Sequence, residues 1–354
     1  MSRTTTAPPV PREGAVVVPG RGPCGSLRTP ATAALPVIAA ARGMAVPAAL
    51  YATTAAAGGG SMVGWAVPMT TDIAFPLAVL AVISTHLPTA LRAFLLTLAV
   101  VDDLGAILII ALFFTSDLNY WALAWAFAGL VVFYLLQRLR VRGWWYLPQG
   151  VVVWALVYNG GIHATVAGVA MGLILRTTRD EGEQASPGER TGHLLHPLSA
   201  GICVPLFALF TADVSVSGDA LGKVFTTPEP LGGAIGLVAG KIIGIFAGTY
   251  LAVRFTRAQL NPELAWADAF GLATLAGIGF IVALLIGELA FPGTATGEHV
   301  KAAVLIASLT AALLATLLLR RRNAVYRRLY EEENIDEDAD GIPDIYQRTP
   351  GSGA

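Results

Sequence analysis

Charged residues are scarce in this sequence. Only 13% of its 354 residues are Asp, Glu, Lys or Arg, and 55% are hydrophobic, whereas soluble domains usually carry about 25% charge. So few charges cannot cover a water-exposed surface, and several apolar runs are long enough to cross a bilayer. The sequence therefore predicts an all-α polytopic membrane protein whose main partner is the lipid bilayer. Its net charge of −1 gives no general attraction to nucleic acid.

Cysteine is nearly absent as well, and no signal peptide is apparent. Cys24 lies in a polar stretch and Cys203 in an apolar run, which indicates neither a disulfide framework nor a metal site. The longest apolar run near the N-terminus, at 15–18, is too short for a signal-peptide core. We expect a disordered leader at 1–30, a membrane domain at 31–322 and a cytoplasmic acidic tail at 323–354.

Ten apolar segments follow the leader. With a cytoplasmic N-terminus they place nearly all the arginines of the connecting segments on the cytoplasmic side, as the positive-inside rule requires. We therefore expect about ten transmembrane helices in the plasma or inner membrane, with both termini in the cytoplasm. The segments are 33–57, 64–84, 90–115, 119–137, 144–159, 161–176, 194–212, 230–253, 267–291 and 299–319, the fifth and sixth being short.

Four ionisable residues lie near the middle of these spans. They are Asp72 in the second span, Asp102 and Asp103 in the third, and Lys241 in the eighth. Each costs about 3 kcal/mol to insert, and the four together about 10 kcal/mol, comparable to the stability of a whole domain. A turn would also fit Asp-Asp-Leu-Gly, but apolar residues flank the pair on both sides. One Asp–Lys pair would use a single carboxylate, so the others are free for a cation or for protons.

Two spans carry helix-breaking residues at the same depth. The second has prolines on both sides of Thr70, Thr71 and Asp72, and the ninth has Gly277 and Gly279. Irregular backbone at membrane depth is tolerated only where it lines a cavity or is buried in protein. Spans one to three and eight to ten form two triplets of opposite topology with a broken helix in each. An inverted repeat whose two discontinuous helices cross at the midplane is the architecture of secondary transporters.

Six stretches of the sequence resemble the NhaA family of sodium/proton antiporters, over about residues 25–322. The resemblance implies a secondary active transporter, not an enzyme and without a cofactor, that exchanges Na+ for H+ by alternating access, with Li+ as a further candidate. The stretches are TTDIAF at 70–75, VDDLGAILIIALF at 101–113, GIHATVAGVAMG at 161–172, HLLHPLSAGICVPLFAL at 193–209, GKIIGI at 240–245 and LAGIGFIVALLI at 275–286.

The resemblance also implies roles for the residues at mid-depth. Asp103 matches the family's cation-binding carboxylate, and Asp102 matches its proton-exchanging partner, which pairs with Lys241. Asp72 matches the carboxylate at the crossing of the broken helices, where it offsets their dipole ends. Thr71 is a candidate oxygen ligand. The expected Na+ ligands are therefore Asp102, Asp103, Thr71 and Asp72.

Several alternatives stay open. The family usually has two further spans and a hairpin before the segment that matches residue 30 onward, and the leader stands in their place. Those elements supply much of the family's dimer contact, so a homodimer is an open expectation. A non-transporting relative that keeps every site residue, or a cation channel, would also fit. His163 lies in the family's HAT motif, and we interpret it as a hydrogen-bonded packing residue rather than as an ion ligand.

The acidic tail contains a candidate Ca2+ loop. Asp336, Asp338, Asp340 and Asp344 surround a glycine as in D-x-D-x-D-G loops, although the twelfth position is Gln347 where such a loop has Glu. A solvated acidic tail is the simpler interpretation, and we favour it.

Overall fold

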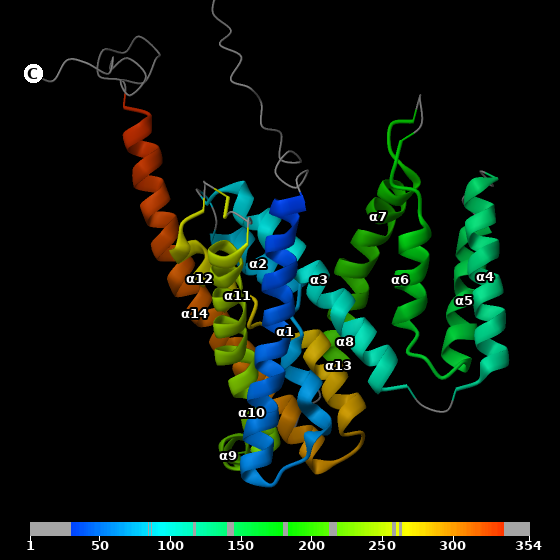
Figure 1. The fold of residues 1–354 in the computed structure, drawn as a ribbon, viewed down its shortest axis with the longest axis horizontal. Coiled ribbons are helices and arrows are strands. Elements are labelled where there is room, and N and C mark those ends of the chain that lie inside the picture. Colours follow the sequence, from blue (N-terminus) through cyan, green and yellow to red (C-terminus); the bar gives the residue numbers. More distant parts are fainter. Residues whose placement is uncertain are drawn as a thin grey trace, which may run out of the picture.

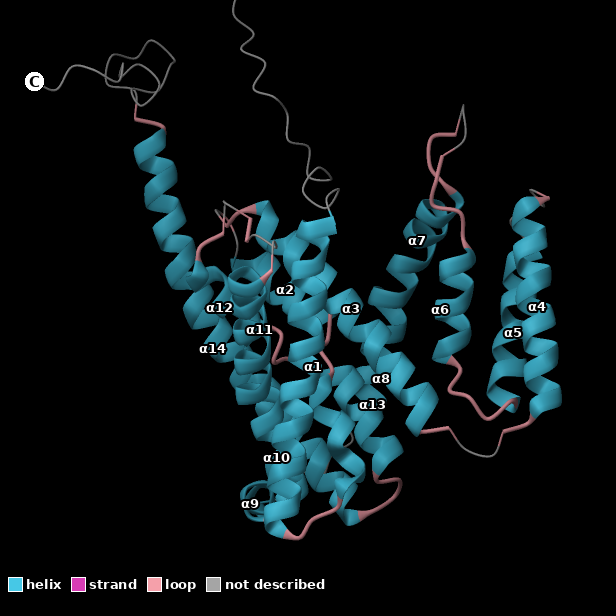
Figure 2. Ribbon diagram, viewed as in Figure 1, coloured by secondary structure: helices cyan, strands magenta, loops and turns pink. Residues whose placement is uncertain are grey.

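The structure, a computed structural model, describes most of the chain. The described residues are 30–83, 85, 87–115, 118–139, 145–179, 183–211, 218–256, 260–261 and 264–335. Regular structure in these ranges is entirely helical (Figure 2). Residues 1–29 of the expected leader and the four tail aspartates lie outside them, so the expectations for both stay predictions.

The helices follow the predicted spans (Figure 1). The first triplet is α1 (Pro30–Gly58), the 3-10 segment η1 (Met62–Met69) with α2 (Ala74–Ile83), and α3 (Thr89–Phe113). The middle of the chain forms α4 (Tyr120–Arg138), α5 (Tyr146–Asn159), α6 (Thr165–Ile174), and α7 (Pro187–Leu198) joined to α8 (Val204–Thr211) by the π-helical η3 (Ser199–Cys203). The last part forms α9 (Gly218–Thr226), α10 (Pro228–Ile235), the π-helical η4 (Gly236–Gly240), α11 (Lys241–Phe255), α12 (Trp266–Leu275), α13 (Phe280–Ala290) and α14 (Ala295–Glu333).

Six of the described helices are long and apolar enough to cross a bilayer, and the pair α12–α13, bent by 45°, makes a seventh. The other three predicted spans are helical but do not meet this criterion. α5 and α6 have only 14 and 10 residues, and α7 is polar in its first half. The chain is an integral multi-pass helical membrane protein, as its composition predicted.

The last helix is longer than the sequence analysis predicted. The apolar segment ends at residue 319, but α14 continues to Glu333. The continuation RRRNAVYRRLYEEE is rich in good helix formers and lacks proline and glycine, and Arg327 pairs with Glu331 one turn later at 2.8 Å. Residues 323–333 of the expected tail therefore belong to a helix. The short helix α9 was not predicted either.

The two triplets pack against each other through small residues. α1 lies along α11 (Figure 1), and Gly240, Gly244 and Gly248 of the eighth span face it. A Cβ on Gly244 would lie 2.6 Å from the carbonyl oxygen of Arg42, and one on Gly240 would lie 2.8 Å from Cα of Pro47. Glycine at every fourth position lets two helices approach closely in a membrane. This contact holds Lys241 and the first triplet together.

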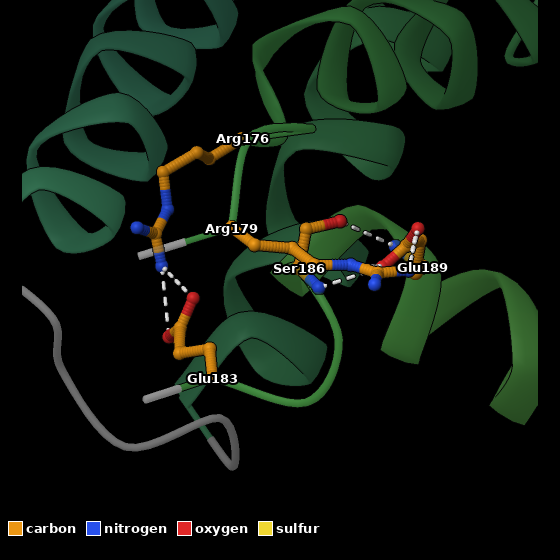
Figure 3. Close-up of polar contacts among 5 residues, drawn as sticks. All are labelled: Arg176, Arg179, Glu183, Ser186 and Glu189. Atoms are coloured by element: carbon orange, nitrogen blue, oxygen red, sulfur yellow. Dashed lines mark hydrogen bonds and ion pairs between the residues drawn. The ribbon is translucent and has the colours of Figure 1, made fainter. Parts of the chain in front are cut away.

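Charged pairs hold the connection between α6 and α7 (Figure 3). Arg176 donates to both carboxylate oxygens of Glu183 at 2.9 Å. Arg179 donates to both oxygens of Glu189 at 2.9 and 2.7 Å. Glu189 also forms a capping box with Ser186 at the start of α7, which satisfies backbone donors at the helix N-terminus.

Candidate functional site

A buried ion pair between α3 and α11 lies at the centre of the candidate site. Nζ of Lys241 is 2.6 Å from Oδ2 of Asp102, and both side chains are 0% exposed. Lys241 directly follows the π-helical turn Gly236–Gly240, a local widening of the helix that is common at functional sites. Removing one partner of such a pair leaves an uncompensated buried charge, at a cost of about 3–5 kcal/mol.

Thr71 joins this ion pair to the broken ninth span. Its Oγ1 lies 2.6 Å from Oδ2 of Asp102 and 3.1 Å from the carbonyl oxygen of Ala276. A hydroxyl has one proton to donate, so these two acceptors compete for it. While Asp102 is ionised, the charged acceptor forms the stronger bond. The side chain expected as a cation ligand therefore also connects Asp102 to the break between α12 and α13.

Asp72 caps two helices at once. Its Oδ1 accepts the N–H of Ala74 at 2.9 Å, at the start of α2, and its Oδ2 accepts the N–H of Ile281 at 3.1 Å, in the first turn of α13. Its own N–H donates to the carbonyl oxygen of Ile278 at 2.8 Å. A carboxylate is stabilising at a helix N-terminus because it meets unpaired N–H groups and the positive dipole end. The role at the crossing of the broken helices that the resemblance implies for Asp72 stays a prediction, and these hydrogen bonds are compatible with it.

Glycine makes the crossing of the two broken spans possible. A Cβ on Gly279 would lie 2.6 Å from Cδ2 of Leu237 and 3.0 Å from the carbonyl oxygen of Thr70, and one on Gly277 would lie 2.9 Å from the carbonyl oxygen of Leu237. Contacts this short leave no room for a side chain. The second, eighth and ninth spans therefore meet here backbone to backbone.

Asp103 lies beside the ion pair with unused bonding capacity. It follows Asp102 on α3, so the two side chains point about 100° apart. Asp103 is half-buried and interacts electrostatically with Asp102, Asp72 and Lys241. Oδ1 of Asp103 and Oδ1 of Asp102 are buried without a hydrogen-bond partner among the described residues. A buried oxygen without a hydrogen bond costs free energy, which a bound ligand would lower. Carboxylate oxygens can bind a hard cation or a proton.

Thr70 supplies a further buried oxygen that the sequence analysis passed over. It is 0% exposed, and its Oγ1 has no hydrogen-bond partner in the part of the chain that the structure describes. The signal was present in the sequence, since Thr70 stands beside Thr71 in the proline-flanked break. From the sequence alone, Thr70 is expected to lie in that break, but not to offer a hydroxyl to the site.

The remaining candidates are not part of this centre. Nδ1 of His163 lies 3.0 Å from Oγ1 of Thr165 at the start of α6, a local hydrogen bond in keeping with a structural role. Within the described ranges, no three or more His, Cys, Asp or Glu side chains are grouped so as to hold a metal ion. A cation at the carboxylates of α3 would therefore complete its shell with hydroxyl, carbonyl or water oxygens.

Comparison with known proteins identifies the family. Residues 23–319 match the family described as Na+/H+ antiporter 1. The chain belongs to this family of NhaA antiporters. The Na+/H+ antiporter NhaA of Streptomyces avermitilis is 65% identical over 326 residues, which cover 92% of this chain and 70% of the relative. NhaA 3 of Streptomyces coelicolor is 64% identical, covering 91% and 69%, and NhaA of Frankia casuarinae is 55% identical, covering 91% and 75%.

Membership of the NhaA family confirms the resemblance drawn from the six sequence stretches. Its named members are antiporters, which are transporters and not enzymes. Like the sequence, the family thus points to ion transport through the membrane rather than to catalysis.

Proposed function

We propose that this chain is a secondary active transporter that exchanges Na+ for H+ across the membrane. The observation that carries the proposal is the buried Asp102–Lys241 pair where two broken helices cross. Next to it, Oδ1 of Asp103 has no hydrogen-bond partner among the described residues. The names of the relatives, Na+/H+ antiporters, support these two substrates.

Competition for the same oxygens would couple the two ions. Na+ prefers hard anionic oxygens, so it binds Asp103 and Asp102 when these are ionised. A proton on either carboxylate removes the negative charge that attracts the cation. Sodium binding therefore requires proton release, and protonation expels sodium. Li+, as another hard monovalent cation, is a second candidate substrate.

The protonation state of Asp102 would determine which acceptor the Thr71 hydroxyl binds, and so would affect the backbone at Ala276. When Asp102 is ionised, it accepts from Thr71 and pairs with Lys241. When Asp102 is protonated, the attraction to Lys241 is lost and the Thr71 hydroxyl becomes available to the carbonyl oxygen of Ala276. The occupancy of the carboxylate is thus linked to the break between α12 and α13.

The arrangement of the spans supports alternating access. α1 and the α10–α11 span run in opposite directions (Figure 1), and each triplet contributes one broken helix to the crossing. In transporters with inverted repeats, one bundle rocks against the other around a site near the midplane. Such movement exchanges the ions only if it occurs with the site loaded by Na+ or by protons.

The test is a measurement of ion exchange by the purified chain in proteoliposomes that contain a pH-sensitive dye and are given pulses of Na+, Li+ or K+. We expect a saturable Na+-dependent proton signal, with an apparent Na+ affinity that weakens as the pH falls. Asp103→Asn and Asp102→Asn should each abolish the signal, whereas Glu331→Gln, at an exposed position on α14, should leave it unchanged. Robust exchange in either aspartate variant would refute the assignment. A proton leak that rises linearly with Na+ would indicate a channel, and no flux at all would indicate a non-transporting relative.

A further inference from the structure

A second buried carboxylate, away from the crossing, accepts hydrogen bonds from two side chains of another helix in addition to the N–H that it caps. Asp268 lies in the first turn of α12 and is 0% exposed. Its Oδ1 accepts from Nε of Arg322 at 2.7 Å, and its Oδ2 accepts from the hydroxyl of Tyr326 at 2.5 Å and from the N–H of Ala265 at 2.8 Å. Arg322 also lies over the Tyr326 ring, 5.2 Å from its centroid.

This cluster connects α12 to the extension of α14 that lies beyond its apolar segment. Arg322 and Tyr326 are one turn apart, so both reach the same carboxylate from one face of the helix. The apolar stretch of α14 needs neither of them to cross the membrane. Because Asp268 is completely buried, its bonds to Arg322 and Tyr326 are less screened by water than those of a surface pair.

α14 also holds the other half of the broken span. Nζ of Lys301, near the start of α14, lies 2.6 Å from Oε2 of Glu288, near the end of α13. Between these two polar contacts, the buried face of α14 packs against both halves through apolar residues. This face consists of Val300, Val304 and Ala307 on the α13 side and of Ala311, Ala315 and Leu319 on the α12 side.

These contacts with α14 fix the ends of α12 and α13 that face the candidate site. Only one short helix, about 12 Å long at 1.5 Å per residue, separates Asp268 from Ala276. Ala276 accepts from Thr71, Ile278 accepts from the N–H of Asp72, and Ile281 donates to the carboxylate of Asp72. A helix transmits a displacement of its first turn to its last, because its hydrogen bonds make it stiff along its axis.

We propose that Asp268, Arg322 and Tyr326 are positioning residues that fix the broken span against α14 and so set where Ala276, Ile278 and Ile281 meet Thr71 and Asp72. The proposal rests on the exchange activity proposed above for its transport measurement. It assigns to the extension of α14 a part in ion affinity, without contact with the ion.

The test combines Arg322→Gln, Arg322→Lys and Tyr326→Phe with Arg327→Gln as the matched control, since Arg327 lies on the same helix and makes an exposed pair. In proteoliposomes we expect Arg322→Gln to raise the KM for Na+ by about threefold to tenfold, within the range that remote substitutions usually give, with a smaller change in maximal rate. Arg322→Lys, which keeps the charge, should recover part of the affinity. A purely structural role would instead lower the rate with the amount of folded protein and leave KM unchanged.

A second measurement does not depend on transport. Hydrogen–deuterium exchange should become faster in the backbone amides of residues 276–281 in Arg322→Gln and Tyr326→Phe, and should stay unchanged in Arg327→Gln. Unchanged protection of 276–281 in both variants would overturn the proposal, even if exchange activity proved absent from the wild-type chain. Normal exchange activity in the wild type, with an unaltered KM in Arg322→Gln, would overturn it while leaving the proposed function intact.

Discussion

Lys241 is the residue on which the electrostatics of the site depend. It is completely buried and lies 2.6 Å from Asp102, so its positive charge offsets part of the unfavourable energy of burying that carboxylate. The same pairing occupies Oδ2 of Asp102, which also accepts from Thr71, so only Oδ1 is open to a cation until Lys241 or Thr71 moves. If Asp102 binds Na+ as proposed, the lysine that stabilises the ionised carboxylate therefore also competes with the cation for it.

Lys241→Ala should destabilise the protein strongly, because it leaves Asp102 buried without a counter-charge. The expected cost is about 3–5 kcal/mol, visible as a lower midpoint of thermal unfolding in detergent. The double variant Asp102→Asn/Lys241→Ala removes both charges and should be more stable than Lys241→Ala alone. A double variant that is no more stable than the single one would show that the lysine stabilises the fold through packing and not through its charge.

Among the helical elements, the crossing of the two broken spans tolerates the least change. A Cβ on Gly279 would lie 2.6 Å from Cδ2 of Leu237 in the eighth span and 3.0 Å from the carbonyl oxygen of Thr70, so a methyl group fits there only if these neighbours move. Gly168, on α6, is a suitable comparison, because a Cβ there would meet nothing within 4 Å. The same substitution at both positions therefore compares a crowded site with an open one.

Gly279→Ala should therefore reduce both stability and exchange, whereas Gly168→Ala should not. Overpacking of a well-packed site costs about 1–3 kcal/mol, while glycine to alanine at an unstrained helical position stabilises by about 0.4–1 kcal/mol. Thermal unfolding and Na+-dependent proton flux of both variants check this. Equal behaviour of the two variants would mean that the crossing adjusts to the added methyl group.

The connection between α6 and α7 gives a prediction about pH. The hydrogen bond from Arg179, together with that from the Ser186 backbone, lowers the pKa of Glu189 from 4.5 to about 2. A lowered pKa means that the contribution of the ionised form is complete above the ordinary value and is lost only as the pH falls toward about 2. Glu189 should therefore stay ionised from about pH 5 to pH 9, and Glu189→Gln should leave the shape of the pH–activity curve unchanged. If Glu189→Gln shifts the pH–activity curve along the pH axis, Glu189 does change its charge in this pH range and the prediction is wrong.

Local sequence signals were sufficient to locate most of the helices, but neither the short helix α9 nor the contacts between helices. Pro68, Gly277 and Gly279 mark the two breaks because they disturb a helix wherever they occur. The contact of Asp268 with Arg322 could not be read in the same way, since 54 residues separate them and nothing local indicates that α12 packs on α14. The hydrogen bond of Thr71 to Asp102 could not be predicted either, because it also joins residues far apart in the sequence. The length of α14 was underestimated because the apolar pattern stops where the membrane segment does, while helix propensity continues.

For the molecule as a whole, the described part of the chain begins and ends at one end of the bundle (Figure 1). α1 starts there and α14 finishes there, while the turn between α13 and α14 lies at the opposite end. The arginines at 320–322 and at 327 and 328 follow the apolar stretch of α14, so the positive-inside rule predicts that this end faces the cytoplasm.

Labelling of single cysteines should verify this orientation. With Cys24 and Cys203 replaced by serine, Asn334→Cys should react with a membrane-impermeant maleimide only from the cytoplasmic side, and Ala295→Cys only from the opposite side. Both positions are exposed at their ends of α14. Labelling of both cysteines from the same side would invalidate the assigned topology.

The double cap made by Asp72 has a consequence for biosynthesis. The second helix that Asp72 caps donates through Ile281, which lies 209 residues further along the chain. The ribosome therefore synthesises Asp72 long before it synthesises this hydrogen-bond donor. The early spans must remain in the bilayer with this acid only half satisfied until the ninth span has been inserted. Completion of the crossing between the two broken spans is therefore a late event, and a nascent chain that is released before the ninth span is made cannot assemble it.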